Sequence, residues 1–344
     1  MGLFSPSRSY LGVDIGSAGI KIIELKGELG KVRLVSYGFS EGLIDLGQKD
    51  TKEIARIINQ ICQQAGMSSR SAVSALPTFS VFSSIINLAG VSKKDIASAV
   101  QWEAKKVIPL PLEEMILDWK KIDSATSGVA KANSRILLTG APRSLVKKYI
   151  EIFKQAQINL LSLETETFAL IRSLLGSDKS AVMLVEVGAA TTDISIIKQS
   201  LPVLNRSIDI GGLTITKAIG NNLNIGLERA EQFKYDLGIS LVNSQNNVIP
   251  KTIAEVISPI INEVKYALNL YQGKNNKAVD KIILSGGSAL LPNLANYLSK
   301  ILNLNVIIGD PWARVSYPTD LKPILDEIGP RLAVAIGLAM REVE

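Results

Sequence analysis

The sequence has no histidine and only one cysteine among its 344 residues. Without histidine, a Ser-His-Asp triad, a histidine general base and a histidine-ligated zinc site are all excluded. A single cysteine excludes an intramolecular disulfide and a cysteine–histidine metal site. Cys62 follows Ile61 on the apolar side of an expected helix, so we predict a buried small side chain and not a reactive thiol.

The chain also lacks a long uncharged apolar run. No segment approaches the roughly 18 residues that a membrane span needs, although the mean hydropathy is +0.23. The segment Met1–Arg8 contains no apolar core for a signal peptide, and Pro6 stands where a myristoylation signal needs Ser or Thr. The sequence therefore predicts a cytoplasmic protein without a direct membrane span.

A basic block with interleaved aromatic residues is missing as well. The net charge of +6 comes from 38 basic and 32 acidic residues. It indicates ordinary surface charge, or mild attraction to an anionic membrane face, ahead of nucleic-acid binding. Apolar residues are abundant, at 47% of the chain, which is enough for a large core in about two domains.

Three glycine-rich strand ends are spread across the chain: Leu11–Ser17 (LGVDIGS), Leu184–Asp193 (LVEVGAATTD) and Ile282–Ser288 (IILSGGS). In each, an apolar run delivers glycines to a turn whose backbone N–H groups can approach a phosphate or a sugar closely. The first two add carboxylates and hydroxyls, which Mg2+ and phosphates require. Each segment alone is weak evidence, because glycines at strand ends are usually only turns. Together they predict one nucleotide site if they meet in space.

In this order and separation the segments resemble the two phosphate loops and the adenosine loop of the actin, heat-shock chaperone and sugar-kinase superfamily. Within it, the chain resembles the PilM family of type IV pilus assembly proteins, a relative of the cell-division protein FtsA. The resemblance extends from about residue 9 to the C-terminus. Beyond the loops it depends on Ser74–Pro77 (SALP), Gln101–Pro111 (QWEAKKVIPLP), Leu117–Trp119 (LDW), Ala230–Lys234 (AEQFK) and Ala333–Arg341 (AVAIGLAMR). The segment that contains Glu103, Pro109 and Pro111 is the most specific for this family.

The resemblance implies an α/β, actin-like (ribonuclease H-like) two-lobe fold with a small inserted α+β subdomain in the first lobe. The expected divisions are residues 1–80 for the first part of the first lobe, 81–156 for the insert, 157–178 for the first lobe continued, 179–314 for the second lobe with the second phosphate loop and the adenosine loop, and 315–344 for the return to the first lobe.

The residue pattern predicts elements that suit such a fold. Strands are expected at 10–15, 20–25 and 32–37, followed by a helix that Asp50 caps and a strand at 72–76. In the insert we expect a helix capped by Ser92, with Ile96, Val100, Ala104 and Val107 facing inward, and a second helix over 143–155. An apolar helix is expected over Ala333–Arg341.

For the first phosphate loop, the resemblance implies that Asp14 holds a Mg2+-bound water. Gly16, Ser17, Ala18 and Gly19 would offer N–H donors and a hydroxyl to the β-phosphate. Lys21 would add a cation there, or would be an outward strand side chain.

In the second loop, Gly188, Ala189, Ala190, Thr191 and Thr192 would surround the γ-phosphate, and Asp193 would hold a second metal-bound water. Glu186 stands where this superfamily usually has aspartate, so its longer side chain would reach the Mg2+ shell in altered geometry. Glu166 would orient the attacking water, or would only cap its helix near the positive end of the helix dipole.

For the nucleoside, Glu231 and Lys234 are three residues apart and so share one helix face. We expect the carboxylate on the ribose hydroxyls and the lysine stem against adenine, with a surface ion pair as the alternative. Gly286, Gly287 and Ser288 would close over the other side of the adenine.

The function that the resemblance implies is a cytoplasmic scaffold of type IV pilus assembly, or of a related secretion system, that binds ATP and Mg2+ and has at most slow ATPase activity. A PilN-like inner-membrane protein would dock its N-terminal peptide between the first lobe and the insert, so the protein would be peripheral to the inner face of the cytoplasmic membrane within the pilus assembly complex. Trp102 and Trp119 would line that groove or belong to the core. The alternatives are a small-molecule kinase or phosphatase of the same superfamily, and an FtsA-like division protein that self-associates into filaments.

Overall fold

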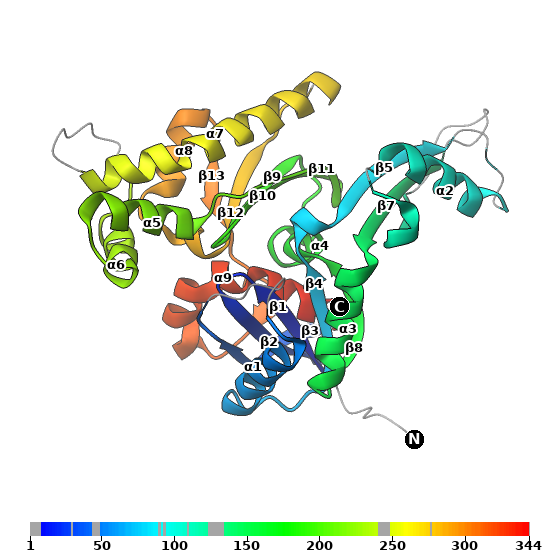
Figure 1. Ribbon diagram of the computed structural model, residues 1–344, viewed down its shortest axis with the longest axis horizontal. Helices are drawn as coiled ribbons and strands as arrows, with labels where there is room; N and C mark the ends of the chain where they lie inside the picture. Colours follow the sequence, from blue (N-terminus) through cyan, green and yellow to red (C-terminus); the bar gives the residue numbers. More distant parts are fainter. Residues whose placement is uncertain are drawn as a thin grey trace.

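The computed structural model describes residues 8–28, 30–42, 49–88, 91, 94–108, 110–122, 134–239, 248–275 and 277–343. Two large sheets form two lobes, and a smaller sheet projects to the side of the first lobe (Figure 1). Pro6, Ser92 and Pro109, on which parts of the sequence analysis depend, lie outside the described residues.

The first lobe has a six-stranded sheet in the order β14-β3-β2-β1-β4-β8. Its strands are β1 (Ser9–Gly16), β2 (Gly19–Glu28), β3 (Lys31–Phe39), β4 (Ser71–Leu76), β8 (Asn159–Thr165) and β14 (Val315–Ser316). Strands β1, β2 and β3 pair antiparallel, and β4 and β8 continue the sheet in parallel from β1. The three strands expected at the start of the chain are therefore confirmed.

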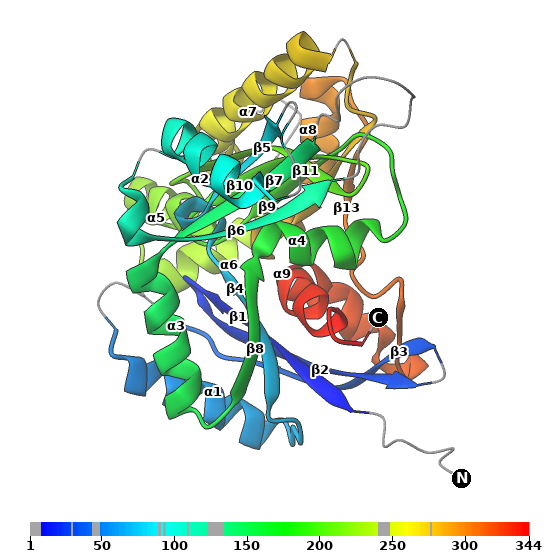
Figure 2. The ribbon, with the colours of Figure 1, turned by 90° about the vertical axis from the view of Figure 1, so that its right-hand side faces the viewer.

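Helices cover both faces of this sheet. Helices α1 (Thr51–Gln64) and α3 (Arg143–Gln155) lie on one side, and α9 (Lys322–Met340) lies on the other (Figure 2). Asp50 caps α1 as expected, because its Oδ1 accepts the N–H of Lys52 at 3.2 Å. The lone Cys62 is buried in the core on the α1 side, as expected.

The final helix differs from the expectation. It begins at Lys322 and not near Ala333, because Pro323 occupies the first turn, where a proline is tolerated, and Pro330 is accommodated inside the helix. The carbonyl of Pro330 accepts the N–H of Gly286 at 3.0 Å, which ties α9 to the third glycine-rich segment. Helix α9 therefore packs on the first sheet and also touches the second lobe.

The second lobe has a five-stranded sheet in the order β11-β10-β9-β12-β13. Its strands are β9 (Val182–Val187), β10 (Thr192–Lys198), β11 (Leu201–Ile208), β12 (Lys281–Ser285) and β13 (Val306–Ile308). The helices are α5 (Gly212–Leu223), α6 (Leu227–Leu237), α7 (Val248–Asn275) and α8 (Leu294–Leu302). The apolar stripe of α7 packs into the main core of this lobe, and Pro259 lies inside α7.

The insert is a three-stranded antiparallel sheet in the order β5-β7-β6, with one helix on it. Its elements are β5 (Phe82–Leu88), α2 (Ile96–Val107), β6 (Met115–Ile122) and β7 (Ser134–Pro142). Ile96, Val100 and Ala104 face inward as expected, but Val107 is 37% exposed. The helix ends there and the chain becomes extended, so Ile108 is the residue that packs over Gly140.

Helix α3 was expected to belong to the insert. Its buried Tyr149, Ile152 and Phe153 instead join the core of the first lobe beside α1. The strand that precedes it, β7, belongs to the small sheet, so the chain crosses from the insert to the first lobe at about Pro142. The predicted division at residue 156 remains a proposal.

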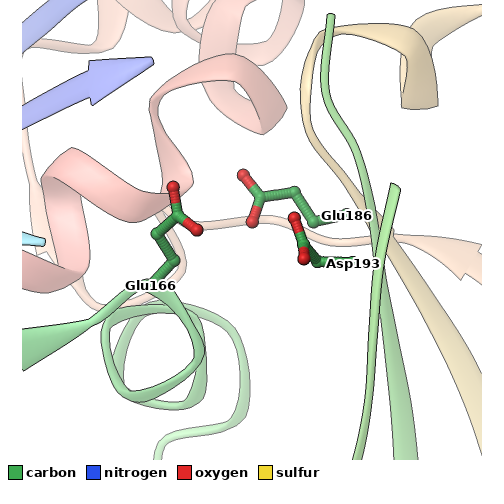
Figure 3. A group of neighbouring side chains, drawn as sticks. All are labelled: Glu166, Glu186 and Asp193. Atoms are coloured by element: carbon green, nitrogen blue, oxygen red, sulfur yellow. The ribbon is translucent and has the colours of Figure 1, made fainter. Parts of the chain in front are cut away.

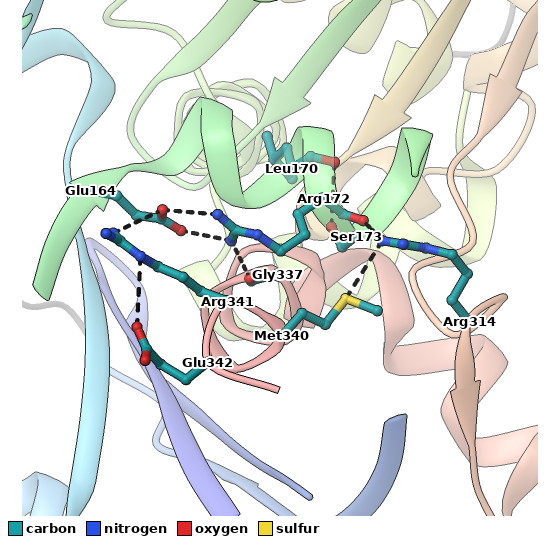
Figure 4. Close-up of polar contacts among 9 residues, drawn as sticks. All are labelled: Glu164, Leu170, Arg172, Ser173, Arg314, Gly337, Met340, Arg341 and Glu342. Carbon is teal, nitrogen blue, oxygen red and sulfur yellow. Dashed lines mark hydrogen bonds and ion pairs between the residues drawn. The ribbon is translucent and has the colours of Figure 1, made fainter. Parts of the chain in front are cut away.

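The two lobes are connected through helix α4 (Glu166–Leu170) and one π-helical turn, Ile171–Leu175. Arg172 in this turn pairs with Glu164 at 2.8 Å and donates to the carbonyl of Gly337 in α9, and Arg341 reaches the same carboxylate at 3.2 Å (Figure 4). Arg314 donates to the carbonyl of Arg172. These contacts tie the C-terminal helix to the segment that leads into the second lobe.

Candidate functional site

The three glycine-rich strand ends meet at one cleft between the lobes. The cleft has a volume of about 1010 Å³. Its walls contain every residue that the sequence analysis assigned to the site except Gly19 and Thr192. These are Asp14, Gly16, Ser17, Ala18, Lys21, Glu166, Glu186, Gly188, Ala189, Ala190, Thr191, Asp193, Glu231, Lys234, Gly286, Gly287 and Ser288.

Gly19 and Thr192 instead support the turns from behind. Gly19 has φ +140°, and a Cβ there would lie 2.0 Å from the carbonyl oxygen of Ser40, so the turn between β1 and β2 needs glycine for packing. The Thr192 side chain is buried, and its hydroxyl donates to the carbonyl of Ile210 at 2.6 Å. The hydroxyl of Thr192 is therefore engaged away from the cleft.

In the first turn, Asp14 and Lys21 form an ion pair of 3.0 Å. They lie opposite each other on the antiparallel strands β1 and β2, so the register itself brings the charges together. Burial alone would lower the pKa of Lys21, but Asp14 outweighs it, with help from Glu186 and Glu166, and the net pKa is raised. Lys21 thus faces the cleft as a stable cation, and the alternative of an outward side chain does not apply.

In the second turn, carboxylates gather. Glu186 and Asp193 are opposite each other on β9 and β10, and Glu166 reaches toward them from the start of α4 (Figure 3). One oxygen from each of these three residues lies within 4.8 Å of the others. Burial and then the neighbouring acids raise the pKa of Glu166 to about 8, and the same two causes raise the pKa of Glu186 well above its usual range. Burial raises the pKa of Asp193 as well.

Glu166 lies in the first turn of α4, near the positive end of the helix dipole, so that alternative stays open, and its carboxylate also makes a longer-range contact. Its Oε2 accepts hydrogen bonds from the backbone N–H of Thr78 at 2.7 Å and from the hydroxyl of Thr78 at 2.9 Å. Thr78 opens the short connection from β4 to the insert. Glu166 therefore links the carboxylate cluster to the base of the insert.

The carboxylate cluster suits a metal cation. Within the described residues, Glu186 Oε2 and Asp193 Oδ1 are buried without a hydrogen-bond partner. Buried carboxylate oxygens without a donor or a cation are costly, and hard divalent cations prefer carboxylate oxygens. The residues present therefore fit a Mg2+ ion.

At the other end of the cleft, Lys234 holds Glu231 in place. Lys234 is only 2% exposed, and its Nζ donates to both carboxylate oxygens of Glu231 at 2.7 Å and to the hydroxyl of Thr216 at 3.0 Å. Burial lowers the pKa of Lys234, and the contact with Glu231 opposes this shift. The pair is not a freely solvated surface ion pair, and its geometry orients a carboxylate at the cleft wall.

The third glycine-rich segment closes this end with bare backbone. Gly286 has φ +84°, and a Cβ there would lie 2.5 Å from the carbonyl oxygen of Val187. At the start of α5, a Cβ on Gly212 would lie 2.3 Å from the hydroxyl of Ser288. Glycine at both positions therefore allows the third segment to pack closely against β9 and against the start of α5.

Two residues at this end were not expected from the sequence. Tyr235 lines the cleft beside Lys234 and donates its hydroxyl to the carbonyl of Gly287 at 3.3 Å, and its position directly after Lys234 could have indicated it. Arg331 lines the cleft from α9, 5.6 Å from the ring of Phe39 and 3.9 Å from Glu41. It belongs to no glycine-rich motif, so no local pattern indicated Arg331.

The insert exposes its tryptophans. Trp102 is 64% exposed on α2, with the Lys106 ammonium 6.0 Å above its ring, and Trp119 on β6 is 39% exposed. Phe79, on the connection that leads to the insert, is exposed and lines the cleft. The alternative that both tryptophans belong to the core is therefore wrong.

A family model described as type IV pilus assembly protein PilM matches residues 12–343 of this chain. Among curated proteins, the chain is similar to the cell division protein FtsA of Enterococcus faecalis, with 22% identity over 86% of this chain and 77% of FtsA.

None of the helices in the described part of the chain has the length and apolar character that crossing a bilayer requires.

Solved structures are also similar over nearly the whole chain. A PilM-PilN type IV pilus biogenesis complex is similar over 98% of this chain and 100% of that chain, with 25% identity and a TM-score of 0.86. MreB5 of Spiroplasma citri bound to AMPPNP is similar in fold over 97% of this chain and 96% of that chain, with 16% identity and a TM-score of 0.55. The predicted actin-like fold is confirmed by these likenesses.

Proposed function

The chain belongs to the PilM family of type IV pilus assembly proteins, and from this premise we propose that it is an ATP-binding scaffold that docks the N-terminal peptide of a PilN-like inner-membrane protein. The observation that carries the nucleotide part is the convergence of three glycine-rich strand ends on one cleft. The likeness to an actin-like protein solved with AMPPNP supports ATP as the ligand.

Different residues of the cleft would bind the phosphates, the ribose and the base of the nucleotide. Gly16–Ala18 and Ala189–Thr191 line the cleft from opposite lobes, where their backbone N–H groups would suit phosphates. Lys21 would add positive charge beside the first turn. Glu231, held by Lys234, suits the ribose hydroxyls. The surface at Gly286 and Gly287, with Tyr235 and Arg331 beside it, suits the base.

A bound Mg2+ would neutralise phosphate charge at the carboxylate cluster. Asp14, Glu186 and Asp193 are the residues that would hold it in the ATP complex, largely through water. We propose at most slow hydrolysis. Glu166 would orient water, but its carboxylate is engaged by Thr78 and its pKa of about 8 leaves it largely protonated at neutral pH without a cation.

The partner part of the proposal depends on the insert. The likeness to the PilM-PilN complex supports a PilN-like partner. Exposed Phe79 at the base of the insert, together with Trp102 and Trp119 on its surface, offers apolar contacts of the kind that anchor peptides. The chain would then be held at the inner face of the cytoplasmic membrane by its partner within the pilus assembly complex.

The test is a pair of calorimetric titrations on the full chain, one with ATP and Mg2+ and one with a peptide from the cytoplasmic end of the PilN-like protein. Trp102→Ala and Trp119→Ala should weaken the peptide by about tenfold, as a hot-spot aromatic does, and leave ATP affinity unchanged. Tyr266→Ala is the matched control, because Tyr266 is an exposed aromatic on α7 of the second lobe. Insert variants that lose ATP and keep the peptide would refute the proposal.

A further inference from the structure

The segment that joins the two lobes is held by charged contacts outside the cleft. We propose that Arg172 fixes the angle between the lobes, and that its contacts limit how far the empty cleft opens. The proposal deepens the proposed function, on which it rests for the role of the cleft, by naming the residues that regulate that site. Arg172 is not among the described residues that line the cleft, so it acts as a positioning residue and not as a ligand contact.

The chain passes between the lobes twice, and the two passages lie side by side. The first passage contains α4 and the π-helical turn and ends at Gly176, and the second is 309–314. A Cβ on Gly309 would lie 2.8 Å from Cδ2 of Leu174, and a Cβ on Gly176 would lie 3.0 Å from Nε of Arg314. Glycine at these positions therefore lets the passages pack closely, and a change in the lobe angle has to bend both of them.

Apolar packing between the lobes does not by itself fix that angle. One core cluster contains side chains from β4 in the first lobe, from β9, β10 and β12 in the second lobe, and from α9. Hydrophobic attraction is non-directional, and packed elements can slide past one another by small shear motions. The lobe angle is therefore fixed only if directional contacts are added to this core.

Arg172 supplies such contacts through both its side chain and its backbone (Figure 4). Its guanidinium binds the two carboxylate oxygens of Glu164 at 2.8 and 3.0 Å, a bidentate geometry that fixes direction as well as distance. The same group donates to the carbonyl of Gly337 in α9, and the carbonyl of Arg172 accepts from Arg314. Arg172 therefore joins β8, α9 and both passages at one point.

Burial makes these contacts effective. The side chains of Glu164 and Arg172 are 9% and 20% exposed, so water screens the pair less than it screens a surface ion pair. Arg341, the residue that follows α9, reaches the same carboxylate at 3.2 Å. Because both cations bind one carboxylate, removing the charge of Glu164 would release both of them.

The bend itself has a place in the same turn. Gly176 donates its N–H to the carbonyl of Ile171 at 3.2 Å, the spacing of a π-helix, and its φ of +52° lies in the left-handed region. Hinges absorb motion in a few residues at the end of an element, often small ones. Arg172 lies between α4 and this glycine, so its contacts hold α4, and with it the cleft residue Glu166, against the first lobe.

The experiment measures the distance between spin labels on the two lobes by double electron–electron resonance, in nucleotide-free full-length protein. Cys62→Ala removes the single native cysteine, and Lys147→Cys on α3 and Asn296→Cys on α8 carry the labels at exposed positions. We expect a narrow distance distribution with Arg172 and Glu164 intact. Arg172→Met and Glu164→Gln should each broaden it by at least about twofold, because the joint then keeps only its apolar packing.

Arg206→Met is the matched control, because Arg206 forms a partly buried ion pair with Glu263 inside the second lobe. It should leave the distance distribution unchanged. A second label pair, Lys217→Cys on α5 with Asn296→Cys on α8, lies within one lobe and should keep its distance in every variant. Melting temperatures are measured in parallel, and a purely structural role of Arg172 would lower the melting temperature without broadening the interlobe distance.

An unchanged interlobe distribution in Arg172→Met and Glu164→Gln would overturn the proposal, and so would equal broadening of both label pairs. ATP with Mg2+ should narrow the distribution of the variants again, because the nucleotide would bind both lobes. If the variants broaden as described and ATP does not bind the parent, the proposed function fails and the role of Arg172 stands. If ATP binds and the variants keep the distribution of the parent, only the role of Arg172 fails.

Discussion

Two strand turns line the cleft from opposite lobes, and each places two charged side chains opposite each other on antiparallel strands. On β1 and β2, Asp14 lies opposite Lys21, whereas on β10 and β9, Asp193 lies opposite Glu186. Opposite charges in such a pair stabilise a sheet, and like charges destabilise it. The first turn thus carries its own counterion, and the second is stabilised by whatever proton or cation it binds.

The two turns would therefore bind different parts of a charged ligand in different ways. In the first turn the charges of Asp14 and Lys21 compensate each other, so this turn needs no metal for its own charge balance. The second turn offers N–H groups beside acids, so an anionic ligand can approach it only together with a cation.

The largest expected effect is the pH dependence of the metal-free protein. The pKa of Glu166 is about 4.5 in the unfolded chain and about 8 in the fold, so the folded state holds the extra proton between these values. The contribution of Glu166 to the free energy of unfolding should therefore be greatest below about pH 4.5. It should fall as the pH rises to about 8, by up to about 1.4 kcal/mol per pH unit for each proton retained. Urea unfolding at pH 5 to 8 checks this, and a flat or rising profile contradicts it. Added Mg2+ should reduce the slope.

The next effect sharpens the contrast between the turns. Asp14→Asn should lower the free energy of unfolding by about 3 kcal/mol, because it leaves Lys21 in a mostly buried position without its partner. The double variant Asp14→Asn with Lys21→Met should recover much of that loss. Glu186→Gln, the same kind of change in the second turn, should stabilise the metal-free protein. Chemical denaturation of the parent and the three variants measures these free energies of unfolding. Equal losses for Asp14→Asn and Glu186→Gln would contradict the difference between the two turns.

Hydrolysis tests Glu166 and Glu186 separately. Glu166→Ala should lower the slow ATPase rate by about tenfold, because it removes the group that would orient water. Glu186→Asp should preserve or raise the rate, because it restores the side-chain length usual in this superfamily. A phosphate-release assay measures both, and the opposite order would show that the two roles were exchanged.

The smallest effect concerns the link to the insert. Thr78→Val removes one hydrogen bond to Glu166 while keeping the backbone one, at a cost of about 1 kcal/mol. If Glu166 couples the cleft to the insert, the variant should also reduce the influence of ATP on peptide affinity. Thr78→Ser is the conservative control and should restore both. Calorimetry of the peptide with and without ATP checks this, and unchanged influence in Thr78→Val would confine Thr78 to a structural role.

Local chemistry explains which features could be predicted from the sequence. The glycine-rich strand ends and the Asp50 cap depend on residues that are close in the chain, and the structure has them where they were expected. Features fixed by distant contacts were not predictable. Arg331 reaches the cleft because α9 packs on the first sheet and also touches the second lobe. The buried face of α3 joins the core of the first lobe beside α1.

The same reasoning applies to the charges of the site. From the sequence alone, Lys21 could be either a cation in the cleft or an outward side chain, since only the β1–β2 register brings it to Asp14. Helix periodicity placed Val107 inward, but the end of α2 turned Ile108 inward in its place. Thr78 holds Glu166 across 88 positions of the chain, so no local pattern could reveal that contact.

The central claim, one nucleotide cleft built from three strand ends, is tested most directly by calorimetric titration of the full chain with ATP, in Mg2+ and again in chelator. We expect one ATP per chain, with affinity at least about tenfold weaker in chelator, because the second turn then meets the phosphates without a cation. No saturable binding at millimolar ATP in Mg2+ would contradict the nucleotide cleft, and equal affinity in both buffers would contradict the role of the carboxylates.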